Sequence, residues 1–180
     1  MIFSLIPSLV QDLPDITIQG KVSRKKNIFS VHYDVAGNIG EIFIPSPIAR
    51  PARMDDLWRT TCFELFIAIK NSPGYWEFNL SPSGEWNVYA MDAYRQVNMR
   101  EETRIQRLHF KVKKDTEIFS LETELDLSPI IQEGLPIEAG ITSVIQANSG
   151  RNSYWALTHP HPEADFHLRK SFVFEFRYTL

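Results

Sequence analysis

Three short runs of alternating residues constrain the fold of this chain more than any other feature. They are Thr61–Lys70, Tyr75–Ser81 and Glu85–Asp92, and the connections between them are rich in Asn, Ser, Pro and Gly. Consecutive side chains of a strand point to opposite faces, so each run has one apolar face and one mixed face. Runs of this length, separated by turn residues, predict an antiparallel meander.

The mixed faces of these runs carry carboxylates and amides between aromatic residues. Glu64, Glu77 and Asn79 lie there, on the side opposite the apolar residues. A solvated face more often carries Lys, Thr and Ser, so we interpret this face as a binding surface; the alternative is an ordinary outer face of a sandwich. The apolar faces hold Phe63, Leu65, Ile67, Ile69, Trp76, Phe78, Leu80, Trp86, Val88 and Ala90.

The rest of the chain continues the pattern of short strands and turns. About nine to eleven strands with little helix predict an all-β fold, an antiparallel β-sandwich of the jelly-roll or immunoglobulin-like type. No linker, repeat or low-complexity tract divides the chain, so residues 1–180 are expected to form a single domain. Two hairpins are expected, Ile16–Ser23 with Ile28–Ala36 and Arg104–Lys113 with Glu117–Asp126. Further expected elements are strands at residues 1–6, Glu41–Ile44, Ile137–Asn148, Tyr154–Leu157 and Ser171–Thr179, the last with Phe172, Phe174 and Phe176 on one side, and a helical turn at Leu127–Glu133.

Composition excludes several classes of function. The net charge of −3 argues against a nucleic-acid partner, and no run approaches the ~20 apolar residues of a membrane span. Residues 1–15 have no basic residue ahead of their apolar part, which is unlike a signal peptide. The single cysteine, Cys62, excludes an intramolecular disulfide and is expected to be a buried thiol. These features predict a cytoplasmic protein without a nucleic-acid or membrane partner, and they leave its oligomeric state open.

Four motifs carry a resemblance to a known family. They are D-x-L-W-x-x-T-C-F-E-x-F from Asp55, Y-W-E-F-N-x-S-P-S-G-x-W from Tyr75, Y-x-x-x-A-Y-R from Tyr89, and W-A-L-x-H-P followed by D-F-H from Trp155. Together they resemble the bacterial DOMON-like proteins, which are grouped with the family 9 carbohydrate-binding modules. The resemblance extends from Asp55 to the C-terminus and implies a DOMON-like sandwich with a saccharide site.

The resemblance also implies which residues contact the ligand. In the related modules, a tryptophan before a strand and a second one near the C-terminal end sandwich a sugar, and polar side chains bond its hydroxyls. Trp58, Glu64 and Trp155 match that pattern by position. Asn79, Arg95 and Gln146 match it only by residue type and expected face. The His/Pro-rich loop that contains His159 is expected to complete the wall beside Trp155.

The main functional prediction is therefore non-catalytic binding of a small polar ligand, foremost a saccharide, in a concave-face site. Pyranose rings have apolar faces that stack on indole and a hydroxyl rim that needs donors and acceptors. The sequence shows neither the export signal nor the attached catalytic domain usual for family 9 modules, so a soluble mono- or oligosaccharide is expected rather than a cell wall. Alternatively, Arg95 and the glutamates form a buried ion-pair network that closes one end of the sandwich.

Two other classes of function stay open. Paired carboxylates such as Glu64 and Glu77 are the equipment of a glycan-active enzyme, with a base from His109, His159, His161 or His167. The other class is a haem- or metal-binding DOMON domain. Met91 and His159 are candidate haem ligands, and the candidate ligands for a divalent metal are His159, His161, Asp165 and His167. No cofactor is predicted, because no signature places these ligands together. Calcium, through Asp55 and Asp56, remains a candidate, whereas haem is disfavoured.

Overall fold

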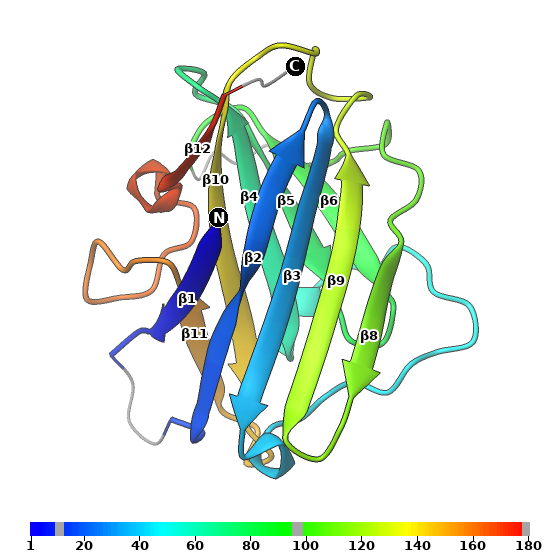
Figure 1. Cartoon of the computed structure of the whole chain (residues 1–180), viewed down its shortest axis with the longest axis vertical. Helices are drawn as coiled ribbons and strands as arrows, with labels where there is room; N and C mark the ends of the chain where they lie inside the picture. Colours follow the sequence, from blue (N-terminus) through cyan, green and yellow to red (C-terminus); the bar gives the residue numbers. More distant parts are fainter. Residues whose placement is uncertain (10–12, 95–98, 178–180) are drawn as a thin grey trace.

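Two antiparallel sheets face each other in the computed structural model, which describes residues 1–9, 13–94 and 99–177 (Figure 1). The front sheet has the order β1-β2-β3-β9-β8, and the back sheet has the order β7-β6-β5-β4-β10-β11, with β12 paired to β10. The strands are β1 (Ile2–Pro7), β2 (Ile16–Lys25), β3 (Ile28–Gly37), β4 (Cys62–Ile69), β5 (Tyr75–Leu80), β6 (Trp86–Met91), β7 (Arg100–Glu101), β8 (Phe110–Lys114), β9 (Ile118–Asp126), β10 (Ile137–Gln146), β11 (Asn152–Ala156) and β12 (Phe174–Phe176). The predicted all-β sandwich is confirmed.

Strand β1 joins the two sheets. Its first part, Ile2–Leu5, pairs with β2 in the front sheet, and its last residues, Ile6 and Pro7, pair with β11 in the back sheet. Because one strand belongs to both sheets, they form a single curled surface, a half-barrel, with the remaining sides open. The predicted hairpin of β2 and β3 is confirmed by a register that runs from Ile16 with Gly37 to Lys25 with Ile28.

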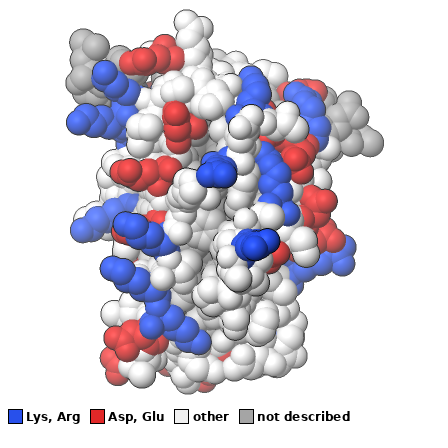
Figure 2. Space-filling model, turned by 90° about the vertical axis from the view of Figure 1, so that its right-hand side faces the viewer, with Lys and Arg blue, Asp and Glu red and all other residues white. Residues whose placement is uncertain are grey.

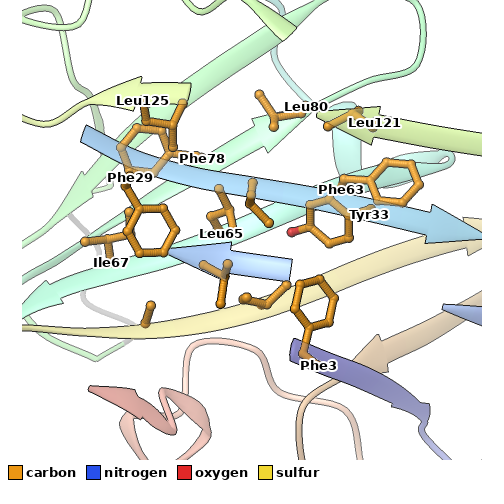
Figure 3. Close-up of a cluster of buried hydrophobic side chains, with 14 of the residues drawn as sticks. Phe3, Phe29, Tyr33, Phe63, Leu65, Ile67, Phe78, Leu80, Leu121 and Leu125 are labelled. Carbon is orange, nitrogen blue, oxygen red and sulfur yellow. The ribbon is translucent and has the colours of Figure 1, made fainter. Parts of the chain in front are cut away.

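The main core fills the space between the sheets. The alternation in β4, β5 and β6 turns the apolar residues toward β3 and β9, as predicted. Figure 3 shows those of β4 and β5 meeting the side chains of the front sheet. Phe63 stacks on Phe119 with ring centroids 5.5 Å apart and lies 4.9 Å from the ring of Tyr33. Burying such large side chains contributes about 1.5–3 kcal/mol each, so this face is fixed by the hydrophobic effect.

A second apolar cluster covers the outer face of the back sheet. It consists of Phe66, Ala68, Tyr75, Tyr89, Met91 and Phe172, with Trp58 and Phe166 packed against it. The C-terminal segment 164–173 supplies the cover, and Phe172 lies over Gly140 of β10, where an added Cβ would come within 3.0 Å of its ring. Strand β4 is therefore buried on both faces, which explains its nearly continuous apolar sequence.

Some boundaries differ from the sequence-based expectations. Glu41–Ile44 does not form the predicted strand. A 3₁₀ turn, η1 (Ile39–Glu41), occurs there instead and is followed by an isolated bridge from Ile42 to Ala147. The reason is that the chain turns at Gly37, which has a φ of 120°, and then enters the proline-rich loop. The last strand is shorter than predicted within the described residues, since β12 pairs only along Ile137–Ala139 of β10. The expected grouping of three phenylalanines is also wrong, because Phe172 packs on the outer cluster and Phe176 in the main core.

Other elements follow the prediction more closely. Strand β8 starts at Phe110 rather than at residue 104, whereas β9 matches the expected hairpin partner. One helical turn occurs after β9, where the Ile131 amide donates to the Leu127 carbonyl at 2.8 Å. Two further 3₁₀ turns, η2 (Leu57–Arg59) and η3 (Arg169–Ser171), precede β4 and β12. In the described part of the chain, no helix has the length and apolar character needed to cross a membrane.

The side of the molecule on which β8 lies carries charges of both signs. Figure 2 shows Lys and Arg interspersed with Asp and Glu on this side, with uncharged surface between them. Cross-strand pairing accounts for part of the pattern, since Lys111 of β8 lies 3.2 Å from Glu122 of β9. Exposed pairs of this kind contribute only about 0–1 kcal/mol, so they shape the surface more than they stabilise the fold.

Candidate functional site

A pocket of about 340 Å³ opens on the outer face of the back sheet. It lies between the sheet and the C-terminal segment 164–173 that covers the outer cluster. A volume of this size is at the low end of the range for small-molecule sites. The lining residues are Trp58, Glu64, Phe66, Glu77, Met99, Val144, Tyr154, Ala164, Asp165, Phe166 and His167.

Strand register builds the polar floor of the pocket. Glu64 of β4 lies directly opposite Asn79 of β5 on one side and Thr142 of β10 on the other. Glu77 lies two residues before Asn79 on the same face of β5, opposite Phe66. The alternation predicted from the sequence therefore brings Glu64, Glu77 and Asn79 together, as expected for one face of a meander. Glu64 and Glu77 line the pocket, whereas Asn79 is fully buried and supports Glu77 without being part of the lining.

The two glutamates, hereafter the carboxyl pair, are buried. Glu64 is 2% exposed and Glu77 5% exposed. Thr142 Oγ1 donates to Glu64 Oε2 at 3.2 Å, and Asn79 Nδ2 donates to Glu77 Oε1 at 2.8 Å. Burial, and secondarily the charge of Glu77, raises the pKa of Glu64 well above its usual range, and burial raises the pKa of Glu77 to about 7. The carboxyl pair therefore retains a proton at neutral pH.

His167 lies at the edge of the carboxyl pair. Its Nε2 is 3.9 Å from Glu77 Oε2, and its Nδ1 is 2.9 Å from the hydroxyl of Tyr75. The ring meets Phe66 edge-on with centroids 5.3 Å apart, and the backbone amide of His167 donates to Asp165. These contacts hold the C-terminal segment against the sheet and place an imidazole in the pocket wall.

Trp58 forms another wall, and a polar cluster beneath it fixes its position. The chain turns into η2 at Asp56, whose φ is 62°. The Trp58 ring meets the Tyr89 ring edge-on at 5.7 Å, and the Tyr89 hydroxyl donates to Asp55 Oδ1 at 2.6 Å. Asn87 donates to the same carboxylate at 3.0 Å. The two aspartates considered as calcium ligands thus stabilise the position of Trp58. The backbone of Asp56 forms the turn, and the side chain of Asp55 accepts the hydrogen bonds from Tyr89 and Asn87.

The second tryptophan is not brought to this pocket. Trp155 is 4% exposed in the main core, and its Nε1 donates to Ser153 at 2.9 Å. Its neighbour Tyr154 lines the pocket, because it pairs with Val144 of β10 and so shares the face of Thr142. Parity along β11 indicates only that Tyr154 and Trp155 lie on opposite faces, since adjacent residues of a strand cannot share a face. The pairing with β10 decides which of the two faces the pocket.

Gln146, His159 and Arg95 are the remaining predicted residues. Gln146 lies beyond the lining of the pocket, where its Nε2 donates to the carbonyl of Arg59 at 3.3 Å. His159 also lies outside the lining, with its Nε2 2.9 Å from the carbonyl of Ile6. Arg95 falls outside the residues that the structure describes.

Among the lining residues that the ligand-site prediction missed are Tyr154, Phe166 and His167. The last two belong to the D-F-H motif, which supported the resemblance and supplied His167 as a candidate base or metal ligand, but not as a saccharide contact. The motif ends on a segment that returns to the sheet, and its phenylalanine packs against Tyr154 at 6.1 Å. The return of this segment to the sheet depends on tertiary contacts, so the D-F-H motif was the one sequence signal that could have predicted it.

The proposed metal ligands do not converge. Within residues 1–9, 13–94 and 99–177, no three His, Cys, Asp or Glu side chains are placed to share a metal ion. Met91, the candidate haem ligand, is buried in the outer cluster. Cys62 is a buried free thiol, as predicted, and burial raises its pKa well above the usual range.

Proteins that bind carbohydrates share this fold. A protein from Bacteroides uniformis, whose carbohydrate-binding role is itself an inference, superposes with a TM-score of 0.67 over 95% of this chain and 83% of its own, at 10% identity. A family 9 carbohydrate-binding module from Caldicellulosiruptor kristjanssonii in complex with glucose gives 0.61 at 13% identity, covering 99% and 84% of the two chains. A module of the same family and organism in complex with cellotriose gives 0.53 at 14% identity over 85% and 71%. No family model and no curated protein matches the sequence, so the likeness is one of fold.

Proposed function

We propose that this protein binds a small saccharide, without catalysis, in the pocket over the carboxyl pair. The observation that carries the proposal is the meeting of Trp58, Tyr154 and Phe166 with two buried carboxyl groups in one pocket. Aromatic rings match the C–H faces of a pyranose, and carboxyl groups bond its hydroxyls in pairs. The fold shared with the glucose and cellotriose complexes supports the same interpretation.

We also propose that the chain is a DOMON-like domain and that its ligand is a soluble mono- or oligosaccharide in the cytoplasm. The four motifs support the first part. The pocket volume of about 340 Å³ supports the second, because a pocket of that size favours one or two sugar rings over a long polymer surface.

Isothermal titration calorimetry against mono- and disaccharides tests the proposal. We expect millimolar to micromolar binding by the wild type, and a loss of about fivefold or more in Trp58→Ala, since one aromatic contact contributes about 1 kcal/mol or more. Trp76→Phe is a matched control, because the Trp76 ring packs on the main core and its Nε1 donates to Glu102. Equal binding by Trp58→Ala and the wild type would contradict this location for the site.

A second candidate function, glycoside hydrolysis, is favoured by one observation. Glu77 has a pKa of about 7 in a pocket, which suits a general acid at neutral pH. The pKa of Glu64 is raised as well, whereas hydrolysis needs one ionised partner beside the acid, so we rank it below binding. Assays with nitrophenyl glycosides check it: turnover that persists in the double variant Glu64→Gln/Glu77→Gln excludes this mechanism.

A further inference from the structure

The charges that line the pocket set its preference among saccharides. The described lining residues include three carboxyl groups, those of Glu64, Glu77 and Asp165, and one imidazole, that of His167. None of the described lining residues is a lysine or arginine. The pocket is thus built from acceptors and aromatic rings, which is the combination that binds organic cations.

Each member of the carboxyl pair has one oxygen engaged by the protein and one that the described contacts leave open. Glu64 Oε2 accepts from Thr142, and Glu77 Oε1 accepts from Asn79. The other oxygen of Glu77 lies 3.9 Å from His167, which is too far for a hydrogen bond. Glu64 and Glu77 are more than nine-tenths buried and both line the pocket, so a ligand that enters it reaches two acceptors from which water is largely excluded.

The other titratable groups that face the carboxyl pair do not balance its charge. Burial raises the pKa of Tyr33, whose hydroxyl donates to the carbonyl of Glu64, and that of Cys62 on the same strand face. Burial and Asp55 likewise raise the pKa of Tyr89. All three are neutral at pH 7, and the imidazole of His167 lies at the edge of the pair, with its Nε2 3.9 Å from Glu77 Oε2.

We infer that the saccharide bound here carries a protonated amino group, as in a hexosamine, whose ammonium lies against the carboxyl pair. The inference rests on the proposed saccharide binding and specifies its ligand class. The ammonium supplies a positive charge that no described lysine or arginine of the lining provides, and it donates to the open oxygens, while the sugar ring contacts Trp58 and Tyr154. With one proton retained, the carboxyl pair carries a single negative charge, which the ammonium of the ligand balances, so no proton has to leave the pocket on binding.

Calorimetry with matched sugar pairs at pH 7 tests the inference. The pairs are glucose and glucosamine, galactose and galactosamine, and mannose and mannosamine, which differ only in one hydroxyl or ammonium group. At least one amino sugar should bind about tenfold or more tightly than its neutral partner, since a charge-assisted bond to a buried group contributes about that factor. The N-acetyl form of that sugar, which has no charge, should lose the preference.

The variants locate the preference. Glu77→Gln and Glu64→Gln should each bring the amino sugar to within about threefold of its neutral partner. Glu117→Gln serves as the control, because its side chain is exposed next to the front sheet, and it should keep the wild-type preference. Thermal melts confirm that each variant is folded. A preference that survives in both pocket variants would overturn the inference.

The remaining outcomes separate the inference from the proposed function. Neutral sugars that bind as tightly as amino sugars would refute the amino-sugar preference and leave saccharide binding standing. No binding by any sugar of either series would refute both. Ethanolamine that binds as tightly as the amino sugars would show a site for simple cations and would overturn the saccharide component.

Discussion

Replacement of Glu77 by glutamine should change how the stability of the protein depends on pH. Between pH 4.5 and about 7, the unfolded chain has lost the Glu77 proton whereas the folded chain keeps it. Folding therefore takes up a proton in this window, and the free energy of unfolding falls as the pH rises. Below pH 4.5 and above pH 7 the contribution of Glu77 is constant.

The magnitude follows from the pKa of about 7 against an ordinary value of 4.5. Because each pKa unit corresponds to about 1.36 kcal/mol, the wild type should lose about 3 kcal/mol of stability between pH 4.5 and pH 8 through Glu77 alone. Glu64 adds a loss of the same sign, since burial raises its pKa too. The variant Glu77→Gln keeps an acceptor for Asn79 but has no proton to lose, so its stability should fall much less over the same range.

Urea denaturation at pH 5, 6, 7 and 8, followed by tryptophan fluorescence, measures the effect. The two proteins differ only at residue 77, so the difference between variant and wild type isolates the contribution of Glu77, including its effect on Glu64. Glu117→Gln, which changes an exposed carboxylate, should follow the wild type. Parallel curves for Glu77→Gln and the wild type would refute the view that Glu77 is buried and protonated at neutral pH.

Four further substitutions test other parts of the structure. Tyr154→Ala should weaken saccharide binding about tenfold, because Tyr154 lines the pocket. Trp155→Phe should leave binding within about twofold and cost about 1–3 kcal/mol of stability, because the indole is buried in the main core. Calorimetry measures the binding and urea denaturation the stability, and the reverse pattern would contradict the assignment of the two residues to opposite faces. Phe172→Ala should cost about 3–5 kcal/mol and weaken binding as well, since this ring anchors the covering segment; unchanged binding would show that the segment does not shape the pocket. Arg104 holds the pKa of Glu102 at about 2, so the Glu102 carboxylate stabilises the fold above pH 4.5, and this contribution is lost as the pH falls toward 2. In Glu102→Gln, the free energy of unfolding should therefore change less between pH 4.5 and pH 2. A profile identical to the wild type would count against this ion pair.

The fold was predictable because alternation and turn chemistry are local signals. The runs around Phe63, Phe78 and Val88 each specify a face, and residues such as Gly37 mark where the chain must turn. The same parity placed Glu64 and Glu77 on one surface, and the structure brings them into one pocket. Where the outcome depended on distant contacts, the prediction was wrong, as for Phe172, which packs on the outer cluster instead of sharing a face with Phe176.

The sequence by itself determined the class of fold, the strands of the back sheet and the polar floor of the site. Only the tertiary structure decided which residues form the walls. Tyr154 rather than Trp155 lines the pocket because the pairing of β11 with β10 fixes its parity, and no residue of β11 specifies that register alone. Phe166 and His167 reach the sheet through the return of the C-terminal segment over Gly140. Long-range pairing and packing, unlike alternation, depend on residues far apart in the chain, and that is why they became visible only in three dimensions.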